Sequence, residues 1–462
     1  MDSGPARFPV LDRRRAAVLL HPSSLLADGD AEGGAFGTRG RTFVDWLASA
    51  GFSVWQVLPL GPTGADGSPY WARSDHAGNA AFVDRLQHPP GGERAFHDFC
   101  RRSGAWLADY ALFEALARWQ NGAPWWEWPW PLRNREPYAL DQARKDFAAE
   151  IGAIQYEQWQ FSWQWRELRD YAHQRGVRLF GDLPIYVAPD SATTWTQREQ
   201  FQLDHESRPL AVAGVPPDYF SADGQLWGNP LYDWDRMRWD GFRFWRERLG
   251  SQLERYDLLR IDHFRGLAAY WAVPAGASNA RGGEWRPAAG REMLEAVARD
   301  QRELPLVAED LGVITADVDA LRKDFRLPGM RVLQFAFDGG GENPHLPHNH
   351  GEDTVVYTGT HDNDTTLGWY QALGDDTRAR MHDYLGIWDG DPLDAMIRTA
   401  LASVGRLAVL PAQDVLRLGA DARLNTPGTV AGNWTWRLPL ADLDADLARH
   451  HRELNQLYGR SE

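Results

Sequence analysis

The sequence Leu258-Leu259-Arg260-Ile261, followed by Asp262-His263, is a short apolar run that ends in an acidic residue. The sequence Leu306-Val307-Ala308, followed by Glu309-Asp310, repeats this pattern. Uninterrupted apolar runs of this length are typical of strands that are buried on both faces of a parallel sheet. The acidic residue then lies at the carboxyl end of its strand, where barrel enzymes carry their catalytic groups.

Six further short apolar runs occur along the chain, each followed by a loop that carries acidic, Gly or Pro residues. They are Ala16–Leu20, Val54–Leu58, Val177–Phe180, Arg331–Phe335, Thr354–Tyr357 and Leu407–Leu410. Between the runs, apolar side chains recur at helical spacing, as in Trp106–Trp119, Trp159–Arg175 and Arg291–Arg302. Eight strands that alternate with helices predict an α/β protein, and specifically a (β/α)8 TIM barrel with buried parallel strands.

Two intervals between the expected strands are too long for a single helix. One lies between the second and third strands and the other between the third and fourth. We therefore predict one catalytic barrel over residues 1–462, with inserted subdomains on its C-terminal, catalytic face. The first insertion, about 61–176, is helical and rich in Trp, and the second, about 183–256, forms a loop over the cleft.

The composition excludes several classes of protein. The chain has 462 residues, of which 43% are hydrophobic and 24% charged, as in an ordinary globular protein. A net charge of −15 argues against nucleic acid and anionic membranes as partners. The single cysteine, Cys100, excludes an internal disulfide and a cysteine-rich zinc site. No apolar run reaches the roughly 18 residues of a membrane span.

The N-terminal residues Met1–Pro5 lack a charged segment followed by an apolar one, which a secretory signal requires. We therefore expect a cytoplasmic protein, while the sequence leaves the oligomeric state open. The 23 Trp residues are unusually many. They fit core packing, and they also fit flat apolar platforms on which sugar rings stack. Both interpretations stay open at this point.

Four carboxylates follow expected strands and are predicted to meet at one rim of the barrel: Asp182, Asp262, Glu309 and Asp362. Each alone could be a helix N-cap or a partner in a salt bridge. Together they repel one another and raise one another's pKa. A fold keeps such a cluster when function or a metal ion offsets the cost.

We do not expect a metal ion to offset the repulsion among these carboxylates. No run of alternating oxygen ligands is present, and His263 and His361 each sit directly beside an acid rather than at helical spacing. Arg260 supplies positive charge instead. It lies two residues before Asp262, so both side chains point to the same side of the strand. Arg260 can therefore keep Asp262 ionised, although a purely structural ion pair fits equally well.

Glycoside cleavage is the chemistry that uses two carboxyl groups in different environments together with a neutral polyol. Asp262 would attack the anomeric carbon, and Glu309 would protonate the leaving oxygen because its acidic neighbours raise its pKa. A separation of about 5 Å between these carboxyl groups would retain the anomeric configuration. Asp362 would hold ring hydroxyls, and His263 and His361 would either bind hydroxyls or bond their own loops.

Several longer motifs carry a resemblance to a known family. They are Arg260–Gly266, Ala308–Gly312, Tyr357–Thr365, Gly181–Val187, Gly214–Pro230, Arg331–Phe335, Asn425–Gly428 and Asn433–Arg437. From about His21 to Arg437 the sequence resembles the amylomaltases, also called 4-alpha-glucanotransferases or disproportionating enzymes. Short motifs such as Arg-x-Asp occur in the wider alpha-amylase clan, whereas the Gly214–Pro230 loop together with the His361 segment is more specific.

The resemblance implies a retaining enzyme that moves alpha-1,4-linked glucosyl units between maltooligosaccharides or glucose, with no metal and no cofactor. It implies that Asp262 is the nucleophile, Glu309 the acid/base and Asp362 the transition-state stabiliser. The substrate-binding residues that it implies are Ser68, Tyr70, Asp182, Tyr219, Phe220, Trp227, Arg260, His263, Phe335 and His361.

Three other functions remain open from the sequence. The same residues would serve an alpha-glucan hydrolase, which differs only in whether water or a sugar reaches the covalent intermediate. A catalytically silent glucan-binding protein on the same barrel would have little reason to retain the repelling carboxylates. A metal-dependent barrel hydrolase would lose its activity in a chelator.

The sequence also departs from the family pattern. Gly64–Gly67 stands where relatives usually have Gly-Tyr-Gly-Asp, so that Ala65 replaces a Tyr that contributes to a second glucan site in relatives. Trp71–His76 replaces a more usual Gln-Ser-x-Ser-x-Phe pattern. We therefore expect weaker use of long glucans, fewer cyclic products and a shifted donor preference, with Trp71 and His76 altering the donor-side wall.

Overall fold

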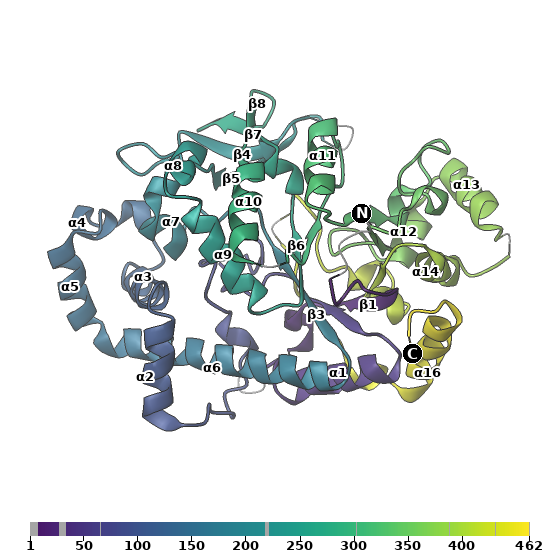
Figure 1. Cartoon of the computed structure of the whole chain (residues 1–462), viewed down its shortest axis with the longest axis horizontal. Helices are drawn as coiled ribbons and strands as arrows, with labels where there is room; N and C mark the ends of the chain where they lie inside the picture. The colour runs from purple at the N-terminus through teal and green to yellow at the C-terminus, as the bar shows by residue number, and fades with distance from the viewer. Residues whose placement is uncertain are drawn as a thin grey trace.

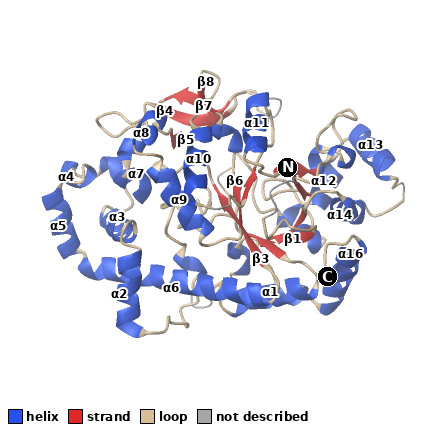
Figure 2. Cartoon of the chain, viewed as in Figure 1, coloured by secondary structure: helices blue, strands red, loops and turns tan. Residues whose placement is uncertain are grey.

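The structure is a computed structural model that describes residues 8–26, 34–64, 66–217, 221–301, 303–387, 389–429 and 431–461. Ala65, Tyr219 and Phe220, which the sequence analysis singled out, lie outside the described residues. Figure 1 shows the strands of a central barrel, with helices around them and further elements at one end. Figure 2 shows the same arrangement by type of secondary structure.

The barrel is an eight-stranded sheet in the order β10-β11-β12-β1-β2-β3-β6-β9, and every hydrogen-bonded pair in it is parallel. Between the two strands at the ends of this order, the Ala308 amide donates to the Pro328 carbonyl at 2.9 Å, which brings the edges together. The strands are β1 (Arg15–Leu19), β2 (Val54–Gln56), β3 (Arg178–Leu183), β6 (Leu258–Ile261), β9 (Leu306–Ala308), β10 (Gly329–Val332), β11 (Thr354–Tyr357) and β12 (Leu407–Pro411). This confirms the predicted (β/α)8 TIM barrel.

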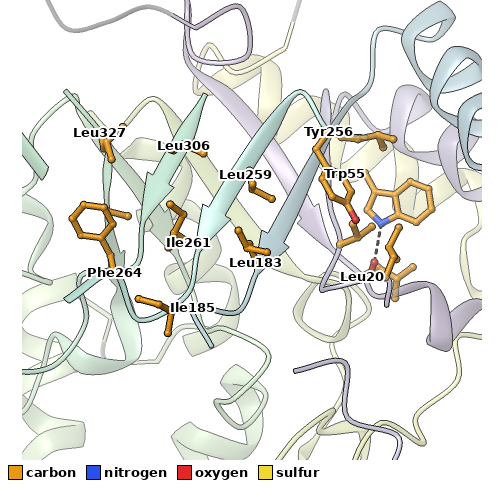
Figure 3. Packing of buried hydrophobic residues seen from close by; sticks show 14 of the residues in the cluster. Leu20, Trp55, Leu183, Ile185, Tyr256, Leu259, Ile261, Phe264, Leu306 and Leu327 are labelled. Carbon is orange, nitrogen blue, oxygen red and sulfur yellow. Dashed lines mark hydrogen bonds between the residues drawn. The ribbon is translucent and has the colours of Figure 1, made fainter. Parts of the chain in front are cut away.

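Successive side chains of each barrel strand point alternately into the barrel and out toward the helices, so they form two separate hydrophobic cores. In β6, Leu258 belongs to the core inside the barrel, and Leu259 and Ile261 belong to the core between the barrel and its helices. Figure 3 shows part of the outer core, including Trp55, whose indole Nε1 donates to the Leu20 carbonyl at 2.8 Å. Because successive side chains point to opposite faces, Arg260 must point inward with Leu258.

Helices surround the barrel and continue from its strands. Those of the first interval, between β2 and β3, are α2 (Gly92–Arg102), α3 (Leu107–Trp119), α4 (Trp130–Arg133), α5 (Pro137–Asp146) and α6 (Ala148–Gln174). The others are α1 (Thr38–Ser49), α7 (Ala192–Thr196), α8 (Trp234–Trp239), α9 (Arg243–Leu253), α10 (Gly290–Asp300), α11 (Ala316–Asp324), α12 (Thr366–Ala372), α13 (Asp375–Leu385), α14 (Pro392–Ala402), α15 (Ala412–Val415) and α16 (Ala445–Leu457).

The helix α6 links the first insertion to the barrel. It packs on α1 and β3 toward the barrel and on α2, α3 and α5 within the insertion (Figure 1). The expected helix Trp159–Arg175 is therefore the second part of a longer helix. The insertion has its own core around Phe113, Trp125 and Trp128, and Trp195 of α7 joins this core from the segment after β3. Core packing thus accounts for several of the Trp residues.

A second, four-stranded antiparallel sheet, which the sequence analysis missed, lies beyond the carboxyl ends of β3 and β6. It consists of β4 (Ala211–Val215), β5 (Gln225–Pro230), β7 (Ala269–Pro274) and β8 (Glu284–Pro287), in the order β5-β4-β7-β8. The interval expected to form a loop over the cleft therefore contains two strands of a sheet. A smaller difference is that Leu333–Phe335, expected as strand, forms a 3-10 helix after β10. Among the described helices, none combines the length and the apolar character needed to cross a membrane.

Candidate active site

A layer of polar side chains closes the barrel interior at the carboxyl ends of the strands. Asp182 in β3 is the register partner of Arg260 in β6, and both follow inward-facing apolar residues two positions earlier. Glu309 follows β9 two residues after the inward-facing Val307. Gln56 and Tyr357 belong to the same layer, since the Tyr357 hydroxyl donates to the Gln56 side chain at 2.9 Å. The alternation of side chains along each strand thus brings together, inside the barrel, residues that are far apart in the sequence.

Arg260 lies at the centre of this layer with its side chain almost completely buried. Its Nη1 donates to Asp182 Oδ2 at 2.6 Å, and its Nη2 donates to Asp262 Oδ1 at 2.6 Å. Asp182 is fully buried, whereas the Asp262 side chain is 31% exposed. Burial raises the pKa of Asp182, and Arg260 opposes this effect. One buried guanidinium therefore holds two carboxylates, of which only Asp262 is open to a ligand.

Tyr70 extends the cluster toward the strand β11. Its hydroxyl donates to Asp182 Oδ2 at 2.6 Å, and burial together with Asp182 raises its pKa well above the usual value. The Tyr70 ring stacks on the His361 ring, with centroids 5.0 Å apart and planes at 12°. The His361 Nε2 lies 3.3 Å from Asp362 Oδ1. Tyr70, Asp182, His361 and Asp362 therefore form a continuous wall.

Glu309 lies on the other side of Arg260. Its Oε2 accepts from the backbone amide of His263 at 2.8 Å, and its Oε1 accepts from the amide of Leu311 at 3.0 Å. Burial, reinforced by the charge of Asp262, raises the pKa of Glu309 to about 8 against the opposing effect of Arg260. A carboxyl group with this pKa carries its proton at neutral pH, as a general acid must.

His263 connects Glu309 to an aromatic side chain of the second sheet. Its φ of 49° lies in the left-handed region, which a residue other than glycine rarely adopts and which is common at functional sites. The imidazole and the ring of the half-buried Trp227 pack nearly perpendicular, with centroids 4.7 Å apart and planes at 83°. Burial lowers the pKa of His263 to about 4, and its Nε2 is buried with no hydrogen-bond partner among the described residues. The neutral ring can therefore bond a hydroxyl group.

Nine of the predicted site residues thus form one connected group. They are Tyr70, Asp182, Trp227, Arg260, Asp262, His263, Glu309, His361 and Asp362. Ser68 supports this group from behind, since its Oγ accepts from the Tyr70 amide at 3.3 Å. Phe335 is half-buried and packs against the inner core and the His345 ring. Tyr219 and Phe220 lie outside the described residues.

Three residues of the C-terminal segment join the site without having been assigned a role from the sequence. The Asn425 side chain donates to Asp362 Oδ1 at 2.7 Å, and Arg423 donates to the Asp362 carbonyl at 2.7 Å. The Trp434 ring lies 6.2 Å from Tyr70 and 6.1 Å from His361. The only sequence signal was that Asn425 and Trp434 belong to motifs that carry the family resemblance.

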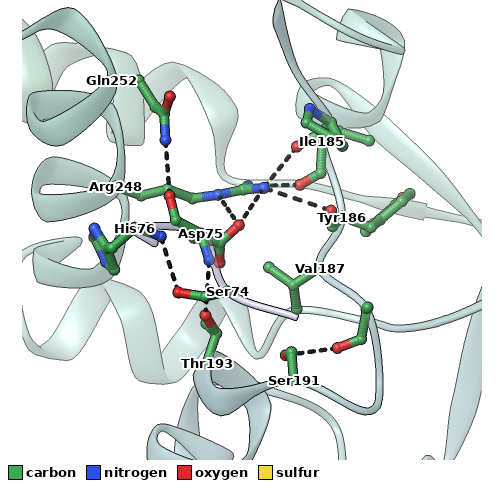
Figure 4. Close-up of polar contacts among 12 residues, drawn as sticks. Ser74, Asp75, His76, Ile185, Tyr186, Val187, Ser191, Thr193, Arg248 and Gln252 are labelled. Atoms are coloured by element: carbon green, nitrogen blue, oxygen red, sulfur yellow. Dashed lines mark hydrogen bonds and ion pairs between the residues drawn. The ribbon is translucent and has the colours of Figure 1, made fainter. Parts of the chain in front are cut away.

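Trp71 and His76, which depart from the family pattern near Tyr70, have different surroundings. His76 turns away from the carboxylates, because its ring faces Trp106 at 6.1 Å and its Nδ1 lies 3.0 Å from Ser251 Oγ. Figure 4 shows His76 beside the Asp75–Arg248 ion pair. Trp71 is half-buried, and its indole makes no hydrogen bond or ring contact with any residue that the structure describes.

A (β/α)8 barrel with a cluster of carboxylates around a buried arginine at its carboxyl face is the architecture of a barrel enzyme that acts on glycosidic bonds. In the described part of the chain, no three His, Cys, Asp or Glu side chains are grouped so that they could hold a metal ion. The family model for 4-alpha-glucanotransferase matches residues 20–88 and 85–442. The chain belongs to the 4-alpha-glucanotransferase family, and it transfers glucan units.

The similar proteins match this chain over nearly all of its length. The 4-alpha-glucanotransferase of Thermus thermophilus is 46% identical, over 94% of this chain and 96% of its own. That of Synechocystis is 44% identical, over 98% of this chain and 99% of its own. An amylomaltase from Streptococcus agalactiae, solved in complex with acarbose, superimposes with a TM-score of 0.92 at 34% identity, over 97% of this chain and all of its own.

Proposed function

We propose that this enzyme cleaves an alpha-1,4 bond of a maltooligosaccharide and passes the glycosyl group to the 4-hydroxyl of another sugar through a covalent intermediate on Asp262. In the first step, the Asp262 carboxylate bonds the anomeric carbon while Glu309 gives its proton to the departing oxygen. In the second step, Glu309 takes a proton from the acceptor hydroxyl, and the new glycosidic bond releases Asp262. The two displacements retain the anomeric configuration.

Asp262 suits the nucleophile because it is the more exposed of the two carboxylates that Arg260 holds. Its Oδ1 accepts from the guanidinium, which leaves Oδ2 for the anomeric carbon. Glu309 suits the acid/base because a pKa raised to about 8 keeps it protonated before cleavage. After cleavage, the negative charge on Asp262 is consumed in the ester, so Glu309 becomes easier to ionise and can act as a base.

Asp362 suits the transition-state stabiliser. Asn425 and His361 hold its carboxylate at the rim, where it is 45% exposed and can bond the sugar hydroxyls. Bonds of this kind strengthen as the ring flattens, so they favour the transition state over the bound substrate. Tyr70, Trp227, His263 and His361 would hold the same sugar, and Phe335, Tyr219 and Phe220 would contact neighbouring units. Asp182 and Ser68 would serve substrate binding indirectly, because the buried Asp182 holds Tyr70 and Arg260 and the Ser68 hydroxyl accepts from the Tyr70 amide.

The shared guanidinium of Arg260 is the observation that carries this proposal, because it fixes a nucleophilic carboxylate beside a protonated acid. The test is the ladder of products from maltotriose. Glucose together with longer maltodextrins indicates transfer to sugar, whereas glucose and maltose alone indicate an alpha-glucan hydrolase. A silent glucan-binding protein would leave maltotriose intact.

The second test is Asp262→Ala, which we expect to abolish turnover while the binding of acarbose, measured by calorimetry, persists. Unchanged turnover would remove Asp262 from the mechanism. Residues 1–462 are proposed to form one catalytic unit with insertions at about 61–176 and 183–256, since both intervals begin at carboxyl ends of barrel strands. The cytoplasmic location stays a prediction.

A further inference from the structure

The loop that carries His361 and Asp362 is fastened at both of its ends to one buried side chain. Asp414, in the helix α15 after β12, is completely buried. Its Oδ2 accepts from the Thr358 hydroxyl at 2.6 Å and from the Thr366 hydroxyl at 2.7 Å, and its Oδ1 accepts from the Thr366 amide at 2.8 Å. Thr358 lies four residues before Asp362 and Thr366 four residues after it.

The Asp414 carboxyl group lies in an unusual environment, because it is buried with no cation beside it within the ranges that the structure describes. Among the described residues, all the hydrogen-bond partners of Asp414 are neutral, and none forms an ion pair with it. Burial raises the pKa of Asp414, and the donors from the two threonines oppose this effect. Burying a carboxyl group without a cation costs free energy, which its three hydrogen bonds must offset. A fold that retains such a group needs those hydrogen bonds for its structure or for its reaction.

The three hydrogen bonds fix the two ends of the loop relative to each other. Thr358 and Thr366 are completely buried, whereas Asp362 between them is exposed at the rim. Gln334 adds a second tie, because its backbone amide donates to the Thr358 carbonyl at 3.3 Å and its side chain donates to the Asp364 carbonyl at 3.0 Å. The ends of the loop are therefore rigid, and the direction of Asp362 depends on them.

We propose that Asp414 is a positioning residue for the transfer reaction, which acts by clamping Thr358 and Thr366 so that Asp362 meets the sugar ring in the transition state. This inference rests on the proposed role of Asp362. Asp414 itself is buried beneath the loop and touches no reacting atom. Its effect must therefore appear in kcat more than in KM, because Asp362 is proposed to bond the sugar most strongly in the transition state.

The first experiment compares Asp414→Asn with Asp257→Asn in the full-length chain. Asp257 is also a largely buried carboxylate, held by His173 and the Leu179 amide, but it lies at the amino end of β6, away from the site. Both variants are expected to lose thermal stability. Only Asp414→Asn is expected to lower kcat for maltotriose, by about 10- to 100-fold with KM changed by about twofold, since misplacement of about 1 Å can cost 100-fold. An equal kcat for the two variants would overturn the proposal.

A second pair of variants decides the question if Asp414→Asn fails to fold. Thr358→Val removes one hydroxyl donor, and Thr358→Ser retains it. We expect Thr358→Val to lower kcat and Thr358→Ser to restore it. If valine and serine at position 358 give the same kcat at the same stability, the clamp has no part in the reaction.

The final experiment separates this inference from the role of Asp362. Asp362→Asn, Asp414→Asn and the double variant are compared with α-maltosyl fluoride, whose fluoride leaves without needing a proton. If Asp414 acts through Asp362, the double variant is no slower than Asp362→Asn. Full activity of Asp362→Asn would contradict the proposed function of Asp362, whereas a slow Asp362→Asn with a fully active Asp414→Asn would contradict the positioning role alone.

Discussion

The Arg260 Nη2 lies 2.6 Å from Asp262 Oδ1, and the other terminal nitrogen of the same guanidinium lies 2.6 Å from Asp182. A lysine has one nitrogen on a flexible chain and cannot hold two carboxylates in one plane. We expect Arg260→Lys to lower kcat for maltotriose by about 100-fold, because a nucleophile displaced by about 1 Å loses this much. Stopped initial-rate assays of glucose release from maltotriose measure this fall in kcat.

The matched control is Arg265→Lys, five residues further along the chain. Among the residues that the structure describes, Arg265 donates only to the Val313 carbonyl, and it lies over the Trp285 ring. Its substitution is expected to leave kcat within about twofold of the parent chain, since exposed contacts contribute little. Equal losses in the two lysine variants would show that the planar bridge between Asp182 and Asp262 is not required.

The pH profile of kcat/KM is expected to follow Glu309. Its pKa is raised to about 8 by burial and by the charge of Asp262, and the proposed first step requires the protonated acid. The activity should therefore be high at neutral pH and fall as the pH rises through about 8. Initial rates at low maltotriose concentration between pH 5 and pH 10 report this group in the free enzyme. A flat profile up to pH 9.5 would contradict the assignment.

The same raised pKa predicts how stability depends on pH. Glu309 ionises near 4.5 in an unfolded chain and near 8 in the folded one, so the unfolded state loses the proton first as the pH rises. The parent chain therefore loses stability between these two values relative to Glu309→Gln, which does not titrate. We expect the difference in Tm between Glu309→Gln and the parent chain to move in favour of the variant from pH 5 to pH 8. A constant difference would show that the pKa is not raised.

The sequence alone predicts the arrangement of Arg260, Asp262 and Glu309 better than that of any other site residues. A period of two along a strand fixes which side chains share a face, so the ion pair of Arg260 with Asp262 could be predicted without coordinates. Parallel strands also end at a common rim, which brought Glu309 and Asp362 to the same place. These inferences need only the strand positions, and eight continuous apolar runs gave those positions to within a few residues.

The rest of the site depends on contacts that leave no periodic signal. Asn425 and Trp434 reach Asp362 and Tyr70 from a segment without helical or strand spacing. The antiparallel sheet was missed because β4 and β5 are short and interrupted by residues such as Gly214 and Gly228. Arg248 looks like any arginine in a helix, and only the folded chain shows that it is completely buried.

Arg248 is expected to be essential for stability. Its guanidinium donates to Asp75 at 3.0 Å and to the carbonyl of Ile185 at 2.9 Å (Figure 4), and to the carbonyl of Pro184 at 2.7 Å. It also donates to the Tyr232 hydroxyl at 3.0 Å. These partners lie close in the sequence to the site residues Tyr70, Asp182 and Trp227. Arg248→Met should therefore lower the free energy of unfolding in urea by about 3–5 kcal/mol, because it leaves Asp75 without its partner.

The control for Arg248 lies on the same helix, α9. Arg246 pairs with Asp300, and both side chains are 40% exposed. Arg246→Met is expected to change the free energy of unfolding by less than about 1 kcal/mol. Similar losses from the two methionine variants would mean that the buried hydrogen bonds of Arg248 contribute no more than an exposed ion pair.

The donor preference is expected to follow the unusual residues that precede and follow Tyr70. A Cβ added at Gly64 would lie 3.9 Å from Trp71 Cδ1, so the half-buried indole borders the backbone next to Ala65. The indole offers a flat apolar face for one sugar ring, whereas an alanine at position 65 has no ring on which a further sugar of a long chain could stack. We expect the initial rate on amylose to be lower than on maltotriose, Trp71→Gln to weaken the use of maltotriose, and Ala65→Tyr to raise the relative rate on amylose. Equal rates of the parent chain on both donors, with large cycloamyloses among the products, would refute this expectation.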